Sequence, residues 1–484
     1  MNDRALEEQS NQAAIARSRR AADHDAALSA VMTGLTDPFM IPYALALGAS
    51  PFQAGLLSSV RNLLLAFVQL GSAEAVRRLG SRRAVVLWTA GLQAALWLPL
   101  AFVQPLFGDG AVLALIAAYT VGTASAALGG PAWGSLVADY TPPAERGRYF
   151  GRRARLAGFA TTAAGAVAGG VLQLSGSRPL AGFGALCLLA AVARAFSWRA
   201  LSQFYDAGWI DDPKQRTSFS AFLFRARHSN FTRFSLCIGL NSLAAHVAAP
   251  FFAVYLLEGL GFGYAEYTAV VLAGSLTGML SSPWWGRLGD RHGNHAVLRW
   301  TSAGVVILPA LWLLFGAPVW MLLWNVAGAF LWGGLNLSAS NFVYDAVSPQ
   351  RRPSYIAYFN VVNGIGVSLG AFVGSWIALA AESEGAAQAF VPVFVASIAL
   401  RAAAALALRR FVREVRPVRD LGLREVILDL VGQRLVGVLG LFSVKPEVEM
   451  GPRRPGTSRA RHAPKRSKRR ARAAAHPGDD ADAP

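Results

Sequence analysis

The sequence is poor in charge and cysteine, and it lacks a nucleotide-binding motif. Only 15% of its 484 residues are charged, whereas soluble domains carry about a quarter. Cys187 and Cys237 stand far apart in apolar stretches, which predicts packing residues and excludes a disulfide framework. No G-x-x-x-x-G-K-S/T motif is present, so ATP is not expected as an energy source. The polar opening MNDRALEEQSNQAAIARSRRAADHD is not expected to be a signal peptide.

What the sequence has in abundance is apolar length. Hydrophobic residues make up 54% of the chain, and the mean hydropathy is +0.37. Apolar runs of about 20 residues can cross a bilayer core of about 30 Å. Twelve such runs are predicted to be transmembrane helices: 26–48, 52–73, 84–105, 111–138, 154–175, 179–200, 234–257, 264–284, 296–316, 318–344, 356–381 and 387–409.

The net charge of +18 is unevenly distributed. Alternate loops and the tails carry nearly all the cations: Arg77, Arg78, Arg82, Arg83, Arg146, Arg148, Arg152, Arg153, Arg155, Lys214, Arg216, Arg225, Arg227, Arg287, Arg291, Arg351 and Arg352. The opposite loops contribute only Arg178. Because cytoplasmic loops are rich in Lys and Arg, this pattern predicts a multi-pass protein of the cell (plasma or inner) membrane with both termini cytoplasmic.

Matching residues show that the two halves of the chain are copies. At a spacing of 212 (250 − 38), Pro38, Tyr43 and Trp88 are matched by Pro250, Tyr255 and Trp300. At a spacing of 206 (345 − 139), Asp139, Pro143 and Arg146 are matched by Asp345, Pro349 and Arg352. An even number of spans per copy predicts parallel repeats about an axis along the membrane normal, with a binding site between them.

A short polar stretch, GRLGDRHGNH (286–295), carries a family resemblance. It resembles the cytoplasmic-loop signature of the major facilitator superfamily, roughly G-x-L-x-D-R-x-G-R-R, through Gly286, Leu288, Asp290, Arg291 and Gly293. The first copy, AEAVRRLGSRR (73–83), keeps Gly80, Arg82 and Arg83 but has Arg77 in place of the acid. The resemblance covers about residues 26–410. It implies an all-α integral membrane fold of twelve transmembrane helices in two parallel-repeat six-helix bundles.

The same resemblance implies that this loop latches the cytoplasmic side, a plain charged turn being the alternative. Gly286 and Gly293 are expected to allow a tight turn. His292 and His295 lack further ligands, so no metal site is predicted.

The repeated D-x-x-x-P-x-x-R pattern predicts gating ion pairs at the cytoplasmic surface. Its residues are Asp139 and Arg146 in the first half, and Asp345 and Arg352 in the second. The alternative is exposed ion pairs worth under about 1 kcal/mol each.

Ionisable residues at membrane depth mark candidate functional sites. Asp37 and Arg61 differ in predicted depth by only about 3 Å, so they could form a buried ion pair that serves proton coupling or anion binding. The alternative is a static structural pair or an aspartate that faces the cavity. His246, with Asn241 nearby, is either a packing histidine or a proton relay or ligand contact.

Further polar residues lie in the last helices of each half. Asn325, Asn336, Asn341, Asn360 and Asn363 can face the central cavity and bind substrate, or can bond between helices, and of these Asn336, Asn360 and Asn363 are the candidates. Arg194 and Arg401 occupy near-equivalent places in the sixth and twelfth helices. Both are predicted to extend to the cytoplasm as interface anchors.

The expected organisation has six parts. These are a cytoplasmic tail (1–25), the first bundle (26–200), a cytoplasmic linker (201–232), the second bundle (233–410), an amphipathic cytoplasmic segment (411–444) and a disordered basic tail (445–484). The run KRSKRRAR (465–472) would be attracted to anionic lipids. Nucleic-acid binding is not expected.

These features predict a secondary transporter that moves a small solute by alternating access and is coupled to protons. No cofactor and no catalytic residue are expected, and the protein is expected to be a monomer. A membrane-embedded enzyme would need a constellation such as H-E-x-x-H, which is not found. A non-transporting receptor or a lipid scramblase on the same fold is the alternative. The substrate and the direction of transport stay open.

Overall fold

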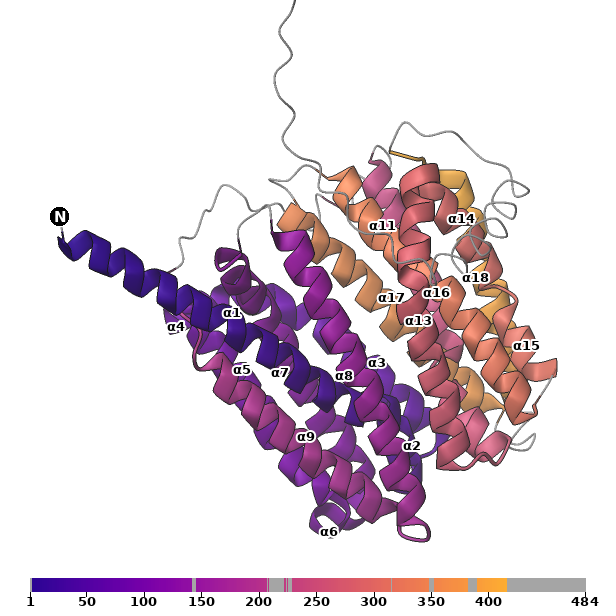
Figure 1. The fold of residues 1–484 in the computed structure, drawn as a ribbon. Helices are drawn as coiled ribbons and strands as arrows, with labels where there is room; N and C mark the ends of the chain where they lie inside the picture. Colours follow the sequence, from indigo (N-terminus) through magenta and orange to yellow (C-terminus); the bar gives the residue numbers. More distant parts are fainter. Residues whose placement is uncertain are drawn as a thin grey trace, which may run out of the picture. The chain divides into compact units, whose positions relative to one another are not determined.

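The computed structural model describes residues 2–141, 145–206, 208, 222, 224, 229–314, 316–347, 352–381 and 390–415. Within these ranges every regular element is helical (Figure 1). The first half contains α1 (Asn2–Thr36), α2 (Met40–Ala46), α3 (Pro51–Val68), α4 (Ser72–Leu79), α5 (Arg82–Ala101), α6 (Val103–Phe107), α7 (Ala111–Asp139), α8 (Arg146–Ser175) and α9 (Pro179–Leu201). The second half contains α11 (Asn230–Ala248), α12 (Phe251–Val254), α13 (Tyr264–His292), α14 (Asn294–Gly304), α15 (Leu308–Leu314), α16 (Pro318–Ala346), α17 (Arg352–Ala380) and α18 (Val391–Phe411).

These helices form the twelve predicted spans. By length and composition, ten described stretches are able to cross a membrane. The other two are α13, which is rich in Gly, Ser and Thr, and the stretch from α1 to α2. The predicted parallel-repeat architecture of twelve helices is confirmed.

Prolines interrupt the first helix of each half at equivalent places. Pro38 lies in a short 3₁₀ turn (Asp37–Phe39) between α1 and α2, and Pro250 lies between α11 and α12. Proline has no N–H to donate and clashes with the preceding turn, so a helix breaks there.

The first helix begins earlier than predicted. We expected the span to start at residue 26, but α1 is continuous from Asn2. Two of its acidic residues make tertiary contacts, because Arg152 and Arg153 of α8 form ion pairs with Asp23 and Asp25. The predicted segments beyond residue 415, including most of 411–444 and all of 445–484, lie outside the described residues, as does most of the linker.

Glycines allow one pair of helices in the second half to approach closely. Gly366, Gly370 and Gly374 of α17 face α11, and a Cβ on each would lie 2.2, 2.2 and 2.1 Å from a backbone carbonyl oxygen of that helix. Such small-residue faces let membrane helices pack at short distance.

The described residues form three hydrophobic cores, one shared by the two halves and two that each belong to one half. The largest contains residues of both halves, such as Tyr43 and Phe183 with Phe251 and Phe394. A second core is built from the second half and the linker residue Phe222. A third core is confined to residues 15–205. The halves therefore share a core at one end and have separate cores at the other.

Candidate functional site

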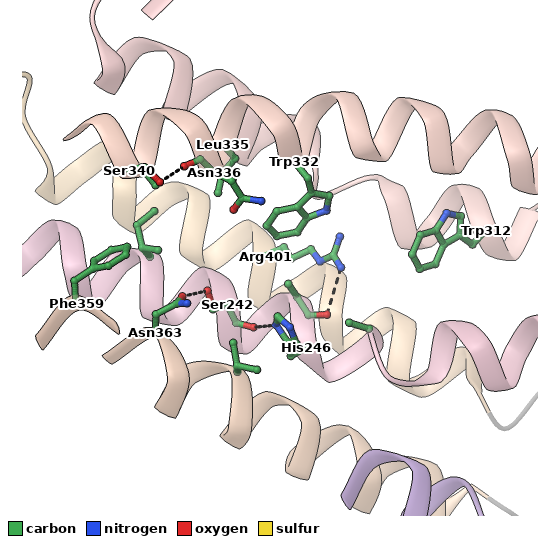
Figure 2. Close-up of a pocket in the computed structure, with 15 residues that line it drawn as sticks. Ser242, His246, Trp312, Trp332, Leu335, Asn336, Ser340, Phe359, Asn363 and Arg401 are labelled. Carbon is green, nitrogen blue, oxygen red and sulfur yellow. Dashed lines mark hydrogen bonds between the residues drawn. The ribbon is translucent and has the colours of Figure 1, made fainter. Parts of the chain in front are cut away.

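A cavity with a volume of about 500 Å³ lies inside the second half (Figure 2). Its lining is mainly apolar and aromatic, with a few polar side chains: Ile238, Ser242, Ala245, His246, Ala249, Trp312, Trp332, Leu335, Asn336, Ala339, Ser340, Phe359, Asn363, Val367 and Arg401. Apolar walls with a few convergent polar groups are typical of small-molecule sites.

Arg401 of α18 is the charged group of this cavity. The residue is 3% exposed. Nη1 donates to the carbonyl of Val305 at 2.9 Å, Nη2 to that of Ala245 at 3.5 Å, and the guanidinium lies 5.8 Å from the centre of the Trp332 ring. The predicted extension of Arg401 to the cytoplasm is therefore wrong. The close packing of α18 against α11 keeps the side chain inside the bundle.

A second cavity, of about 250 Å³, lies between the halves around Asp37 and Arg61. Arg61 Nη2 is 3.7 Å from Asp37 Oδ2, so the predicted ion pair is present. The hydroxyl of Tyr119 donates to Asp37 Oδ1 at 2.9 Å, and the Arg61 guanidinium lies 5.1 Å from the Tyr119 ring centre. The broken helix at Pro38 leaves Asp37 partly exposed, with 39% of its side chain accessible.

His246 connects the two cavities. Together with Ala249 it lines both. Its Nδ1 donates to the carbonyl of Ser242 at 2.9 Å, which leaves Nε2 for other contacts. A solute in the larger cavity would thus lie next to the Asp37–Arg61 pair of the opposite half.

The structure sorts the asparagines that sequence reasoning left open. Asn336 and Asn363 line the larger cavity, and Asn363 accepts a hydrogen bond from Ser242. Asn325 instead donates to the carbonyl of Val270 on a neighbouring helix.

Two predicted cavity residues line neither of these cavities. Asn241 is 2% exposed, and its amide has no hydrogen-bond partner in the described part of the chain. Successive helical residues are turned by 100°, so Asn241 points away from the face that carries Ser242 and His246. Asn360 is exposed on α17, about one turn from Asn363 on the same face of the helix, and it lines neither cavity.

A third cavity, of about 240 Å³, occupies the first half and was not predicted. Asp25 lies 3.1 Å from Arg153 and 3.7 Å from Arg194, and it accepts a hydrogen bond from Ser197 at 2.8 Å. Arg194 is 9% exposed, so its predicted extension to the cytoplasm is also wrong. The only sequence signal was an arginine within an apolar run, which is by default a functional or paired residue.

The glycines of the loop signature behave differently from one another. Gly80 and Gly293 have φ of 67° and 87° and end α4 and α13, which are conformations that favour glycine. Gly286 lies within α13, so the prediction that it forms the turn is wrong. Asp290 and Arg291 are exposed in the last turn of α13.

Arg82 is the best-connected residue of the first-half signature. Its guanidinium lies 2.8 Å from Asp139 and 3.0 Å from Asp206, and it also donates to Ser135 and to the carbonyl of Gly208. The neighbouring Arg83 donates through its backbone N–H to Asp206 at 3.2 Å.

Asp206 therefore holds the start of α5 and the end of the first bundle together. Partial burial opposes its charged form, but hydrogen bonds from the Arg83 backbone and from the Ser81 and Arg82 side chains outweigh this effect. The pKa of the Asp206 carboxyl consequently lies below its ordinary value of 3.8.

The gating acids Asp139 and Asp345 have partners in the two copies of the loop signature. Asp139 pairs with Arg82 of the signature, and Asp345 accepts a hydrogen bond from Asn294 at 2.8 Å. The side chains of Arg146 and Arg352 lie outside the described residues. The acids lie at the ends of α7 and α16, and the start of α5 or α14 packs beside them, which a linear pattern does not reveal.

Within the described ranges, no group of three or more His, Cys, Asp or Glu side chains is placed to hold a metal ion.

Comparisons with known proteins agree with this geometry. The profile of the Major Facilitator Superfamily matches residues 26–229 and 234–461. No curated protein matches the sequence.

Several solved structures share the fold. A variant of the nucleoside transporter NupG has a TM-score of 0.68 at 14% identity, over 82% of this chain and all of that one. A D-xylose-proton symporter gives 0.65 at 11% identity, over 84% of this chain and 99% of that one. A bacterial homologue of the human lysosomal transporter Spinster, in an inward-facing and unoccupied conformation, gives 0.59 at 17% identity, over 82% and 98% of the two chains.

Proposed function

Since this chain belongs to the major facilitator superfamily, and is thus a multi-pass membrane transport protein, we propose that it is a proton-coupled secondary transporter. It moves a small solute across the cell membrane by alternating access, with both termini on the cytoplasmic side. The observation that carries this proposal is that His246 lines both the large cavity and the cavity of the Asp37–Arg61 pair. This shared lining supports the proposal that the solute binds next to the group that exchanges protons.

The distribution of the cores supports alternating access. One core joins the two halves, whereas the other two lie within single halves. Asn336 and Ser340 line the cavity and are exposed. They lie near the C-terminal end of α16, and the basic loop with Arg351 and Arg352 follows that end. We infer an inward-open state, in which the cavity communicates with the cytoplasm and the shared core closes the other side.

The Asp37–Arg61–Tyr119 cluster supports proton coupling. A partly exposed carboxylate next to a cavity can exchange protons with water. Protonation of Asp37 would end its attraction to Arg61 and free the guanidinium. The binding state of the cavity and the protonation of Asp37 would then influence each other, as coupled transport requires.

The cytoplasmic latch belongs to the same proposal. Arg82, Asp139 and Asp206 form a connected cluster in the first half, and Asn294 and Asp345 form its counterpart. These contacts hold each half together at the cytoplasmic end, and Asp290 and Arg291 are placed to exchange partners when that end closes.

The test uses the full chain in liposomes that contain a trapped fluorescent pH reporter. Sugars, nucleosides, organic acids and amines are added outside, and solute-dependent proton movement is recorded. Asp37→Asn is expected to abolish proton movement, and Asp37→Glu to retain part of it. Asp109→Asn, in an exposed loop, is the matched control and should behave as wild type.

Normal solute-driven proton movement in Asp37→Asn would disprove the coupling role. If no solute moves protons or accumulates, the transport proposal fails. Movement of fluorescently labelled lipid between leaflets in the same vesicles would then support the scramblase alternative.

A further inference from the structure

We propose that the large cavity of the second half binds an organic monoanion with an aromatic or apolar body, and that Arg401 binds its carboxylate. This inference rests on the proposed transport function and names the chemical class of its substrate.

The first step is the charge of the cavity. Arg401 is nine-tenths buried or more and lines the cavity, and its Nε has no hydrogen-bond partner among the described residues. None of the described side chains lining the cavity is acidic. Backbone carbonyls and the Trp332 ring supply only partial compensation. A buried cation without a counter-ion is costly unless an anion joins it.

The internal repeat provides the second step. Ala126, Gly130 and Arg153 line the first-half cavity, and the residues 206 positions later (332 − 126) are Trp332, Asn336 and Phe359 of the second-half cavity. Arg194 corresponds in the same way to Arg401, with one residue of offset. The two cavities are thus copies of one site in the fold.

The copies differ in how the arginine is neutralised. Arg194 has Asp25, whose equivalent at a spacing of 212 (237 − 25) is Cys237. The second half has therefore kept the arginine without the aspartate, and it has Phe359 where the first half has Arg153. These differences leave one positive charge in an enlarged space. A ligand carboxylate can take the place that Asp25 fills in the first half.

The third step is the shape and chemistry of the walls. Figure 2 shows Arg401 lying between Trp332 of α16 and helix α11, which carries His246. Trp312 lies on one side of this region and Phe359 on the other, and both line the cavity. Aromatic walls favour an aromatic or apolar body, and Asn336 and Asn363 can hydrogen-bond its polar substituents. A single guanidinium matches one carboxylate by bidentate hydrogen bonding.

Three other arginines of the membrane-spanning helices each have an acidic partner, which Arg401 lacks among the described residues. Arg61 pairs with Asp37, and Arg153 and Arg194 share Asp25. An anion entering from the cytoplasm would therefore find its counter-charge at Arg401.

The experiment measures binding by isothermal titration calorimetry on the purified full chain in detergent. The probes are 2-naphthoate, its neutral isostere 2-naphthamide, and 2-naphthyl phosphate. We expect wild type to bind 2-naphthoate at least about tenfold more tightly than 2-naphthamide, because a charge-assisted hydrogen bond is lost with the amide. Tighter binding of the phosphate would assign the site to phosphorylated solutes and overturn the monocarboxylate assignment.

Four variants locate the effect. Arg401→Gln should weaken 2-naphthoate binding at least about tenfold and remove the preference over the amide. Arg401→Lys should retain part of the preference, since it keeps the charge but not the bidentate geometry. Ala245→Asp introduces a carboxylate beside an intact Arg401 and should abolish the preference by neutralising it in place. Arg194→Gln, at the equivalent position of the first half, should bind as wild type.

The outcomes separate this proposal from the transport proposal. Equal binding of acid and amide by wild type, or wild-type binding of 2-naphthoate by Arg401→Gln, overturns the assignment. If such a result accompanies Asp37-dependent proton movement with an uncharged solute, transport stands and only the substrate class is wrong. Acid-selective binding without any flux would support the site and contradict transport.

Discussion

The two halves of this protein use one scaffold with different charges. In the first half, the buried Arg194 and the partly buried Arg153 share an aspartate on α1 inside the bundle. In the second half, the equivalent arginine on α18 lies in a cavity about twice as large without a carboxylate among the described residues. The cavity of the first half is closed by its own ion pairs, and that of the second half has room for a charged guest.

The same contrast appears at the end of each half that carries the loop signature. Arg82 joins Asp139 in the first half, and at a spacing of 212 (294 − 82) Asn294 joins Asp345 in the second. An acid after the sixth helix of each half binds the backbone at the start of the third helix: Asp206 binds the Arg83 N–H, and Glu414 binds the His295 N–H. Both halves thus keep these contacts at the start of the third helix, although the charge of the residues that make them differs between the halves.

This comparison teaches that duplicated positions keep their place in the structure while their chemistry diverges. Ionic contacts in the first half suit a rigid support. In the second half, the neutral Asn294 suits a change of partner, and Arg401, whose cavity has no acidic lining residue, suits ligand binding. Three substitutions test this difference in stability, and each has a counterpart in the other half or in a loop.

The largest effect is expected from Arg82→Gln. The change removes a buried guanidinium and leaves Asp139 and the partly buried Asp206 without their shared cation, so we expect a loss of about 3 kcal/mol in the free energy of unfolding. Asn294→Ala removes only a neutral donor and should cost about 1 kcal/mol. Unfolding in mixed detergent micelles, followed by circular dichroism, gives both values. Equal losses at the two sites would break the proposed contrast between the halves.

An intermediate effect is expected at the close helix contact of the second half. A Cβ on residue 370 would lie 2.2 Å from the carbonyl oxygen of Leu243, so Gly370→Ala should cost about 2 kcal/mol by forcing α11 and α17 apart.

The first half provides the matched control for this contact. Its equivalent residue is Ala164, and the close approach there is made by Gly34 of α1. Ala164→Gly should cost about 1 kcal/mol or less, mainly through backbone entropy. The thermal unfolding midpoints of both variants are compared with that of wild type. An unchanged midpoint for Gly370→Ala would contradict the packing argument.

The smallest effect concerns Asp206 and pH. Because the folded-state pKa of this carboxyl is lowered, its contribution to stability is present above its ordinary value of 3.8 and is lost as the pH falls through the lower folded value. Asp206→Asn should therefore cost about 1 kcal/mol at pH 6, and the difference from wild type should shrink as the pH approaches 3.

Unfolding midpoints at several pH values between 6 and 3 test this sign. Asp109→Asn, in an exposed loop, should follow the wild-type profile throughout. A difference between Asp206→Asn and wild type that grows on acidification would show that the sign is wrong.

Several features of the site were predictable from the sequence. Long apolar runs indicated the spans, the repeat indicated two parallel bundles, and depth counting brought Asp37 and Arg61 together. These inferences succeeded because they depend on chain length and helical rise, which vary little with context.

Other features were not predictable in the same way. Arg194 and Arg401 were assigned to the cytoplasmic interface, but packing against α1 and α11 directs them inward. Arg82 and Asn294 were not recognised as partners of Asp139 and Asp345, because those contacts join helices distant in sequence. Asn241 lies next to the cavity-lining Ser242, yet helical rotation places it on another face, and Asn360 shares the face of Asn363 but lies about one turn beyond the cavity.

By itself, the sequence determined the membrane-spanning character, the twelve helices and the internal repeat. These follow from hydrophobicity and periodicity, which are properties of local segments. Only the tertiary structure decided which arginine meets a carboxylate and which one faces an open cavity. That outcome depends on the rotation of each helix about its axis and on its neighbours, because a buried charge is stabilised only by the groups that packing brings within a few ångströms of it.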